Sequence, residues 1–521
     1  LYWVAISMSK TIIIIGAGLA GLSAALQAAE NGCNVKLVSS LPSERAQSVM
    51  AEGGINAALN TKDENDSPEE HFTDTIKAAC GLADPNAVWG MTQAAPELVH
   101  WLLKLGVKFN MSGYDDVDLR NFGGQKKKRT AFAQSDTGKQ IMTAMIDAVR
   151  RKEASGMVER FSHHSFLTLR LCGNICCGCV IRDEYSQETV ELPGDAVIVA
   201  TGGMHGLFGN TTGSLSNTGE VTAELFRLGV PLANGEMIQY HPTTVKCGGK
   251  RMLISEAARG EGGRLFAMKD GKQWYFMEEK YPELGNLMPR DITAREIWKV
   301  SHESEVFLDM TEISEEIISN KLSGLVDDCM TYLHKDIRKE PVSVLPGIHY
   351  FMGGILVDEQ HRTPIQNLCA AGECCAQYHG ANRLGGNSLL GALYGGRVAA
   401  KSACEQADVV DLSCATQIDF PPASQISEIK QLNKVMQETM GVVRNENTLL
   451  NGIKTVQALT GNLPLLGMAV LKSALARKES RGAHWREDYP KSNDDDYLKT
   501  TVARFDGKQI QISFVPVPER R

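Results

Sequence analysis

The chain has 521 residues and a formal net charge of −8, from 54 Lys and Arg against 62 Asp and Glu. Its length predicts several domains with large cores, and its charge excludes a positive field that would attract nucleic acid or an anionic membrane surface. No apolar run reaches the roughly 18 residues that span a bilayer, and the apolar residues 1–7 are too short for a secretory signal. We therefore expect a cytoplasmic protein.

The first predicted element is a buried strand at residues 11–15, where a threonine precedes four isoleucines. Gly16, Gly18 and Gly21 follow at the G-x-G-x-x-G spacing, and a helical pattern continues from there. Gly16 allows a tight turn, Gly18 lets a pyrophosphate approach the backbone, and Gly21 lets the helix pack on the strand. The motif predicts a dinucleotide site whose contacts are Gly16, Gly18, Leu19, Ala20 and Gly21.

A second strand is expected at residues 34–38, at the distance that a dinucleotide-binding fold requires. It ends in Ser39, where an Asp or Glu that bonds the ribose usually stands, and a hydroxyl can make the same bond. The loop at 45–58 carries glycines and small residues that let backbone amides approach a flat ligand. Expected cofactor contacts in this loop are Gln47, Ser48, Gly53 and Gly54.

Amphipathic helices are predicted for residues 68–108, and the basic run 126–129 is interpreted as a solvated loop rather than a binding patch. From residue 159 to 199 the chain alternates between β-type segments. The last of them ends in small residues that can pass against the same nucleotide: Ala200, Thr201 and Gly202.

Four of the 13 cysteines lie close together in the sequence, at Cys172, Cys176, Cys177 and Cys179. Nearby glycines indicate a β-hairpin tip, and the spacing matches neither a zinc site nor a ferredoxin-type cluster. The cysteines show no disulfide framework and are expected to be free thiols. We predict no metal site.

The nucleotide-binding fold is predicted to be split in the sequence. The residues 233–341 are more polar, lack βαβ alternation, and are interpreted as an inserted α+β capping domain. A glycine-rich strand pattern returns at 367–373, so residues 8–232 and 342–420 together form the nucleotide-binding domain.

A linker with two prolines is expected at 421–422. Helical periodicity over residues 426–480 predicts a C-terminal helical domain, to which residues 426–521 are assigned. The expected fold class is therefore α/β: a Rossmann-like domain, split by a capping domain and followed by a helical domain.

Five later segments gather His, Arg and Glu beside glycine. An acidic protein that concentrates cations at its turns is interpreted as binding an anion. Each segment alone is compatible with an ordinary structural role, so the interpretation requires that they converge. They are residues 239–243, 255–260, 288–291, 347–350 and 379–390.

In this order the segments resemble the flavoprotein subunits of the succinate dehydrogenase and fumarate reductase family. The shared motifs are H-P-T at 241–243, S-E-x-x-R-G-E-G-G at 255–263, P-R-D at 289–291, H-Y-F-M-G-G at 349–354 and H-G-A-N-R-L-G-G-N-S-L-L at 379–390. The resemblance covers nearly the whole chain, from Thr11 to His484.

The resemblance implies FAD in the split Rossmann-like domain, with further contacts from Glu373, Ser388 and Leu389. It implies a dicarboxylate held between the flavin and the capping domain, where reduced flavin transfers hydride to the alkene. The implied clamp on one carboxylate is His349 with Arg383. The clamp on the other is His241 with Ser255, a position where many members carry Thr.

Arg290 matches the family's proton donor, although guanidinium groups are poor acids. Our hypothesis is that Arg290 only passes a proton on. Glu256 and Arg259 would reload it, because their i, i+3 spacing puts both on one helical face.

Membrane-bound members of the family bond the flavin covalently to a histidine in the loop after the second strand, and the matching residue here is Gln47. Glutamine cannot form this bond, so we expect non-covalent FAD. In the family's chemistry the bond raises the flavin potential. Its absence favours fumarate reduction over succinate oxidation.

Two alternatives stay open besides succinate dehydrogenase. L-aspartate oxidase also holds FAD non-covalently, but its active-site loop carries a Glu that pairs with the substrate ammonium, and Phe122 stands at that place here. The second is a flavin-containing electron-entry subunit without dicarboxylate turnover. For electron supply the resemblance implies a separate iron-sulfur subunit, with a soluble donor as the other source. Contact with the inner face of the cell membrane is expected only through partner subunits.

Overall fold

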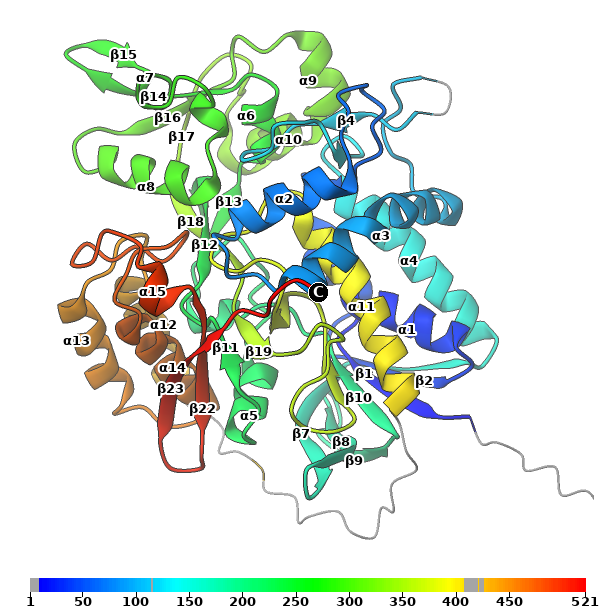
Figure 1. Ribbon diagram of the computed structural model, residues 1–521. Coiled ribbons are helices and arrows are strands. Elements are labelled where there is room, and N and C mark those ends of the chain that lie inside the picture. The colour runs from blue at the N-terminus through cyan, green and yellow to red at the C-terminus, as the bar shows by residue number, and fades with distance from the viewer. Residues whose placement is uncertain (1–8, 114–115, 407–419, 421–425) are drawn as a thin grey trace, which may run out of the picture.

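Figure 1 shows the computed structural model of the protein, which describes residues 9–113, 116–406, 420 and 426–521. The expectations for residues 1–7 and 421–422 concern positions outside these ranges. Figure 1 places the inserted domain (green) above the nucleotide-binding part and the C-terminal part (orange to red) to one side. Within the described ranges, no helix combines the length and apolar character that crossing a membrane requires.

A five-stranded parallel sheet forms the centre of the nucleotide-binding part, in the order β20-β10-β1-β2-β6. Because β1 is made of β-branched residues, it suits a central position, where it pairs with β2 and β10. The last strand, β20, returns from beyond the inserted domain, so the Rossmann-like α/β class is confirmed. The strands are β1 (Thr11–Ile15), β2 (Asn34–Ser39), β6 (Val158–Ser162), β10 (Ala196–Val199) and β20 (Leu368–Ala370).

Each face of this sheet packs on its own core, since side chains alternate along a strand. Ile12 and Ile14 belong to a cluster with the helices α1 (Leu19–Glu30), α3 (Pro85–Leu105), α4 (Thr137–Ala154) and α11 (Asn387–Gln406). Ile13 and Ile15 pack against an antiparallel sheet of β7 (His164–Cys172), β8 (Ile175–Asp183) and β9 (Thr189–Pro193). Because α1 packs on the face of the sheet that carries Ile12 and Ile14, its N-terminus at Leu19 lies shortly after the end of β1 at Ile15.

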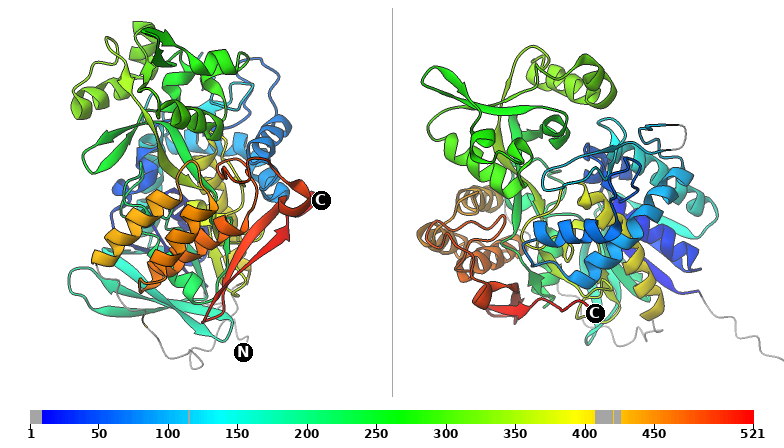
Figure 2. Two further views of the ribbon diagram at one scale, coloured as in Figure 1. Left: turned by 90° about the vertical axis from the view of Figure 1, so that its left-hand side faces the viewer. Right: turned by 45° about the horizontal axis from the view of Figure 1, so that its top comes forward.

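The inserted domain has a separate hydrophobic core. The sheet β13-β12-β18 connects it to the nucleotide-binding part, and the sheet β15-β14-β16-β17 lies above it, as the labels in Figure 1 show. Both views of Figure 2 show the inserted domain (green) at the top of the molecule. The strands of these two sheets are β12 (Ile238–Cys247), β13 (Lys250–Leu253), β14 (Arg264–Lys269), β15 (Lys272–Trp274), β16 (Val306–Asp309), β17 (Val342–Ser343) and β18 (Leu345–Phe351). The last two, β17 and β18, lie beyond residue 341, where the inserted domain was expected to end. The α-helices of the inserted domain are α6 (Glu256–Gly260), α7 (Phe276–Lys280), α8 (Arg290–Val300), α9 (Glu315–Lys321) and α10 (Ser323–Asp328).

The C-terminal part contains α12 (Ile426–Thr439), α13 (Glu446–Val456), α14 (Asn462–Ala476) and the short α15 (Asp494–Tyr497). The expectation of helix up to residue 521 is wrong for the last segment, which forms the hairpin β22 (Lys499–Phe505) and β23 (Ile510–Pro516). This hairpin joins β11 (Leu232–Ala233), β19 (Gly354–Leu356) and β21 (Cys375–Ala376) in one sheet. Its backbone groups therefore pair with strands of the nucleotide-binding part.

The amphipathic helices predicted for residues 68–108 are present as α2 (Pro68–Ala78) and α3. The basic run 126–129 lies in a loop, but the expectation that it is solvated is wrong at Arg129. This side chain is fully buried and forms ion pairs with Asp66 at 2.8 Å and Asp74 at 2.9 Å. Arg129 therefore has a structural role.

The clustered cysteines lie around the turn between β7 and β8, where Gly173 has a φ of 59°, as the predicted hairpin tip requires. The expectation of free thiols holds for Cys176, Cys177 and Cys179 but is wrong for Cys172, which is disulfide-bonded. Among the described residues, no group of three or more His, Cys, Asp or Glu is arranged to hold a metal ion.

Candidate functional site

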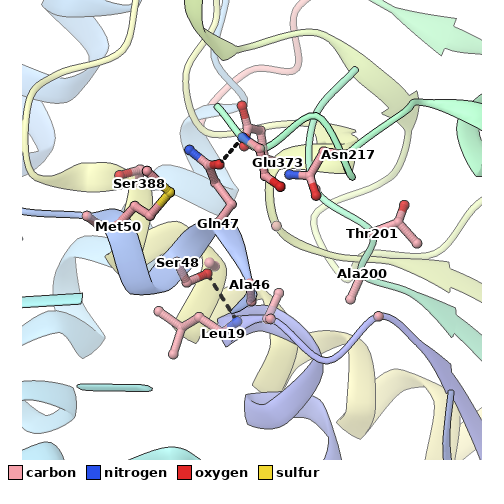
Figure 3. Close-up of a pocket in the computed structure, with 18 of the residues that line it drawn as sticks. Leu19, Ala46, Gln47, Ser48, Met50, Ala200, Thr201, Asn217, Glu373 and Ser388 are labelled. Atoms are coloured by element: carbon pink, nitrogen blue, oxygen red, sulfur yellow. Dashed lines mark hydrogen bonds between the residues drawn. The ribbon is translucent and has the colours of Figure 1, made fainter. Parts of the chain in front are cut away.

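One cavity of about 300 Å³ runs from the Gly16 turn to the underside of the inserted domain. Figure 3 shows Leu19, Ser48, Gln47, Thr201 and Glu373 around this pocket. Of the predicted site residues, Gly21 and Arg259 do not line the cavity. The predicted residues that line it are Gly16, Gly18, Leu19, Ala20, Ser39, Gln47, Ser48, Gly53, Gly54, Phe122, Ala200, Thr201, Gly202, His241, Ser255, Glu256, Arg290, His349, Glu373, Arg383, Ser388 and Leu389.

The glycines of the first motif are required by close backbone contacts. Gly16 has a φ of 112°, and a Cβ there would lie 2.3 Å from the carbonyl oxygen of Ala200. A Cβ on Gly21 would lie 1.9 Å from the carbonyl oxygen of Gly16, so Gly21 serves the packing of α1 on the turn. The helix N-terminus consequently meets the cavity, where its amides and dipole suit a pyrophosphate.

Three side chains further along the cavity fit a bound dinucleotide. The hydroxyl of Ser39, at the end of β2, is buried and has no hydrogen-bond partner within the described part of the chain, as expected for a group that bonds a ribose. Gln47 accepts a hydrogen bond from the backbone N–H of Ser214. Glu373 accepts one from the backbone N–H of Phe351 at 3.0 Å, and burial raises its pKa to about 7. The residues at this end therefore fit FAD.

The cation-bearing segments converge at the other end of the cavity. The rings of His241, on β12, and His349, on β18, have centroids 5.2 Å apart. The guanidinium of Arg383 lies 4.3 Å from the centre of the Tyr350 ring, and among the described residues its Nε has no hydrogen-bond partner. The buried Nε2 of His241 has none there either. Such atoms are costly unless a ligand bonds them, and because a guanidinium N–H can only donate, Arg383 suits a ligand with acceptor oxygens.

The charge state of this end is set by burial and by the arginines. Burial and the nearby positive charge of Arg290 hold the pKa of both His241 and His349 well below its usual range. Burial lowers the pKa of Arg383 to about 9, which leaves the group charged at neutral pH. The imidazoles are thus neutral hydrogen-bonding groups, while the guanidinium groups supply the charge that attracts an anion.

Arg290, Glu256 and Arg259 form a contiguous buried row, in which Glu256 and Arg259 share one face of α6. Arg290 Nε donates to Glu256 Oε2 at 2.8 Å, and Arg259 Nη2 lies 3.4 Å from Glu256 Oε1. Burial alone would raise the pKa of Glu256, but Arg290 and Arg259 hold it below its usual value. The Glu256 carboxylate therefore links Arg290, which lines the cavity, to Arg259, which does not.

Phe122 forms part of the cavity wall where the aspartate oxidases are expected to carry a Glu. The ring is buried between two glycines: a Cβ on Gly53 would lie 2.8 Å from Phe122 Cζ, and one on Gly385 would lie 2.9 Å from Cδ2. Ser255 lines the same region and caps α6 through a hydrogen bond from Ala257 N–H at 3.4 Å. The wall beside the clamp residues is thus apolar on one side.

Sequence reasoning missed three residues of this cavity region. Glu52 lines the cavity, and burial, followed by the charges of Asp328 and Asp136, raises its pKa to about 8. Asn217 also lines it and lies against Gly202. Thr212 contacts His349 directly. Glu52 stands beside Gly53 and Gly54 in the predicted loop, which was the available signal; the other two belong to no motif.

Two family descriptions match the chain: "FAD binding domain" over residues 11–389 and "Fumarate reductase flavoprotein C-term" over residues 459–520. The succinate dehydrogenase flavoprotein subunit of Bacillus subtilis (strain 168) is 38% identical, and the match covers 98% of both chains. The 8-methylmenaquinol:fumarate reductase flavoprotein subunit of Wolinella succinogenes is 32% identical over 98% of this chain and 92% of its own.

Among solved structures, a mutant of E. coli quinol fumarate reductase FrdA has a TM-score of 0.89 at 27% identity, covering 98% of this chain and 97% of that one. These similarities extend over the nucleotide-binding, inserted and C-terminal parts alike. The chain belongs to the family of succinate dehydrogenase and fumarate reductase flavoprotein subunits, and it is an FAD-dependent oxidoreductase.

Proposed function

We propose that the protein reduces fumarate to succinate as a flavoprotein subunit. The observation that carries this proposal is the convergence of His241, His349, Arg383 and Arg290 on one end of the FAD cavity. Two imidazoles and two guanidinium groups in one buried place match a small molecule with two carboxylates. Bound FAD supplies hydride chemistry at this end of the cavity.

The clamp residues orient and polarise the dicarboxylate. His349 and Arg383 bind one carboxylate, and His241 with Ser255 binds the other. Because the site is buried, these charge-assisted hydrogen bonds are stronger than they would be in water. Drawing negative charge toward one carboxylate leaves the distant alkene carbon electron-poor, which prepares it to accept hydride.

Proton delivery is assigned to the row Arg290–Glu256–Arg259. Arg290 faces the cavity and also donates from Nη1 to Gln239 Oε1 at 3.0 Å, which fixes its direction. Glu256 accepts from Arg290 and lies beside Arg259, so a proton given up by Arg290 is replaced through the carboxylate. Arg290 therefore acts as the last member of a relay and not as an independent acid.

The working direction is inferred from Gln47. Its side chain lines the cavity at the position of the family's flavin-bonding histidine and contacts Ser214. Without a covalent bond the flavin has a lower potential, which favours reduction of fumarate. A second candidate is succinate oxidation, favoured by the 38% identity to a succinate dehydrogenase flavoprotein subunit. The buried Phe122 counts against an L-aspartate oxidase, because its ring cannot neutralise an ammonium group.

The direct test is activity of the purified FAD-containing protein with three substrates in parallel. The assays are fumarate with a reduced dye, succinate with an oxidised dye, and L-aspartate with oxygen. We expect turnover to be fastest with fumarate and absent with L-aspartate. Faster succinate oxidation would reverse the direction, and absence of turnover with both diacids would favour an electron-entry subunit.

We further propose a separate iron-sulfur subunit as the electron donor, since the relatives above are named as flavoprotein subunits. Any position at the inner face of a membrane would then depend on that partner. Purification of the native complex, followed by iron and sulfide analysis, tests this. A fully active native enzyme composed of this chain alone would exclude such a subunit.

A further inference from the structure

Thr212 makes a contact with the substrate end of the cavity that no motif indicates. It lies in the loop between β10 and α5 (Glu220–Arg227), and its side chain is largely buried. Its Oγ1 lies 2.8 Å from Nδ1 of His349, and its backbone N–H donates to the carbonyl of Ile348 at 3.0 Å. The loop is therefore hydrogen-bonded both to the side chain of His349 and to the backbone of Ile348.

The direction of the side-chain bond follows from the available partners. The hydroxyl has one proton, which can go to His349 Nδ1 at 2.8 Å or to the Ile348 carbonyl at 3.2 Å. That carbonyl already accepts from the backbone N–H of Thr212. The shorter bond to Nδ1 is the better use of the proton, and it makes Nδ1 an acceptor.

A neutral imidazole carries only one N–H, so an acceptor at Nδ1 leaves the proton on Nε2. Since Nδ1 is engaged by Thr212, Nε2 is the nitrogen that His349 offers to the cavity it lines. Protonation does not provide this donor at neutral pH, because burial, and then the nearby charges of Arg290 and Arg383, hold the pKa of His349 well below its usual range.

We propose that Thr212 is a positioning residue that fixes His349 as the Nε2–H tautomer, so that the neutral ring donates to a substrate carboxylate. This inference rests on the proposed function and adds a residue to its machinery. Thr212 itself does not touch the substrate. Its effect is to make the affinity for dicarboxylates independent of the protonation of His349.

The test is the KM for fumarate of T212V, which replaces the hydroxyl by a methyl group of similar volume. At pH 8 we expect KM to rise about tenfold, since a hydrogen bond to a charged group is lost from a ring without a fixed tautomer. At pH 6 the deficit should persist, because burial and the nearby charges of Arg290 and Arg383 hold the pKa of His349 well below its usual range, so the ring is neutral there too. The conservative variant T212S should restore the wild-type KM at both pH values.

The neighbouring Thr211 offers a matched control. Thr211 is also buried, but its hydroxyl contacts a different histidine: it lies 3.0 Å from Nδ1 of His205. The variant T211V loses an adjacent hydroxyl and should keep KM within about twofold of wild type at both pH values. FAD content and thermal unfolding of all three variants show whether they are folded. Malonate binding, followed by the flavin spectrum, measures dicarboxylate affinity without turnover.

An unchanged KM in T212V, or a T212S variant that keeps the full deficit, would overturn the inference. So would an equal deficit in T211V, since the loss would then be structural. The proposed function fails separately, if wild-type protein neither binds malonate nor turns over fumarate.

Discussion

At the scale of single residues, Glu256 is the residue whose role in the proposed proton relay is most directly testable. It accepts from Arg290 at 2.8 Å and lies 3.4 Å from Arg259. We expect E256Q to lower kcat by roughly 10²-fold or more, the usual size of a general acid–base contribution, with little change in KM because the clamp residues are intact. Steady-state kinetics with fumarate measures both constants. A wild-type kcat in a folded E256Q protein would remove Glu256 from the relay.

Gln47 supports a second residue-level prediction. Its amide contacts the backbone of Ser214 and cannot bond covalently to a flavin ring. Acid precipitation should therefore release all FAD into the supernatant, where its absorbance is measured against the total. Yellow colour that stays in the precipitated protein would show a covalent bond at another residue.

At the scale of elements, the contact between α2 and α11 has a pH dependence of its own. His71 on α2 lies 2.9 Å from Asn387 Oδ1 at the start of α11. Burial, and then the charge of Arg129, lowers the pKa of His71 to about 3. The unfolded chain takes up a proton below its pKa of roughly 6.5, which the folded state resists, so stability is lost as pH falls from there toward 3.

Replacing His71 by Gln should reduce this loss, since the amide still donates to Asn387 but does not titrate. We expect the fall in Tm between pH 7.5 and pH 5 to be smaller in H71Q than in wild type. The control is H100Q, which changes an exposed histidine on α3 and should leave the fall unchanged. Thermal unfolding across this pH range measures it, and equal slopes in wild type and H71Q would contradict the prediction.

The elements also show what a sequence pattern can and cannot predict. The buried strand β1 and the turn at Gly16 were predictable because a β-branched run followed by glycines at this spacing is typical of one structure. That structure is a buried strand that passes through a tight turn into a helix. The hairpin β22–β23 was not, because its strands are partly exposed and stabilised by pairing with β11, more than 250 residues earlier. Arg129 was misread for the same reason, since its partners Asp66 and Asp74 are remote in sequence.

At the scale of the whole molecule, the site exists only because separate parts of the fold meet. His241 lies on β12, Arg290 begins α8, His349 lies on β18, and Arg383 precedes α11. Their convergence could be inferred only from the family's motif order. Pairwise contacts such as Thr212 with His349, 137 residues apart, depend on how one loop folds over another and follow from coordinates alone.

The same convergence makes the cofactor a determinant of stability. The FAD cavity is lined by β1, β2, α11 and the residues just after β10, which come together only in the folded state, so FAD binds the folded chain in preference to the unfolded one. Free FAD at about 100 times its Kd should raise the free energy of unfolding of the apoprotein by about 2.7 kcal/mol. Thermal unfolding at increasing FAD concentration measures this gain.

Riboflavin is the control, because it lacks the pyrophosphate that the N-terminus of α1 is built to bind, and its effect should be much smaller at equal concentration. Equal stabilisation by the two flavins would mean that the Gly16–Gly21 turn contributes little to binding.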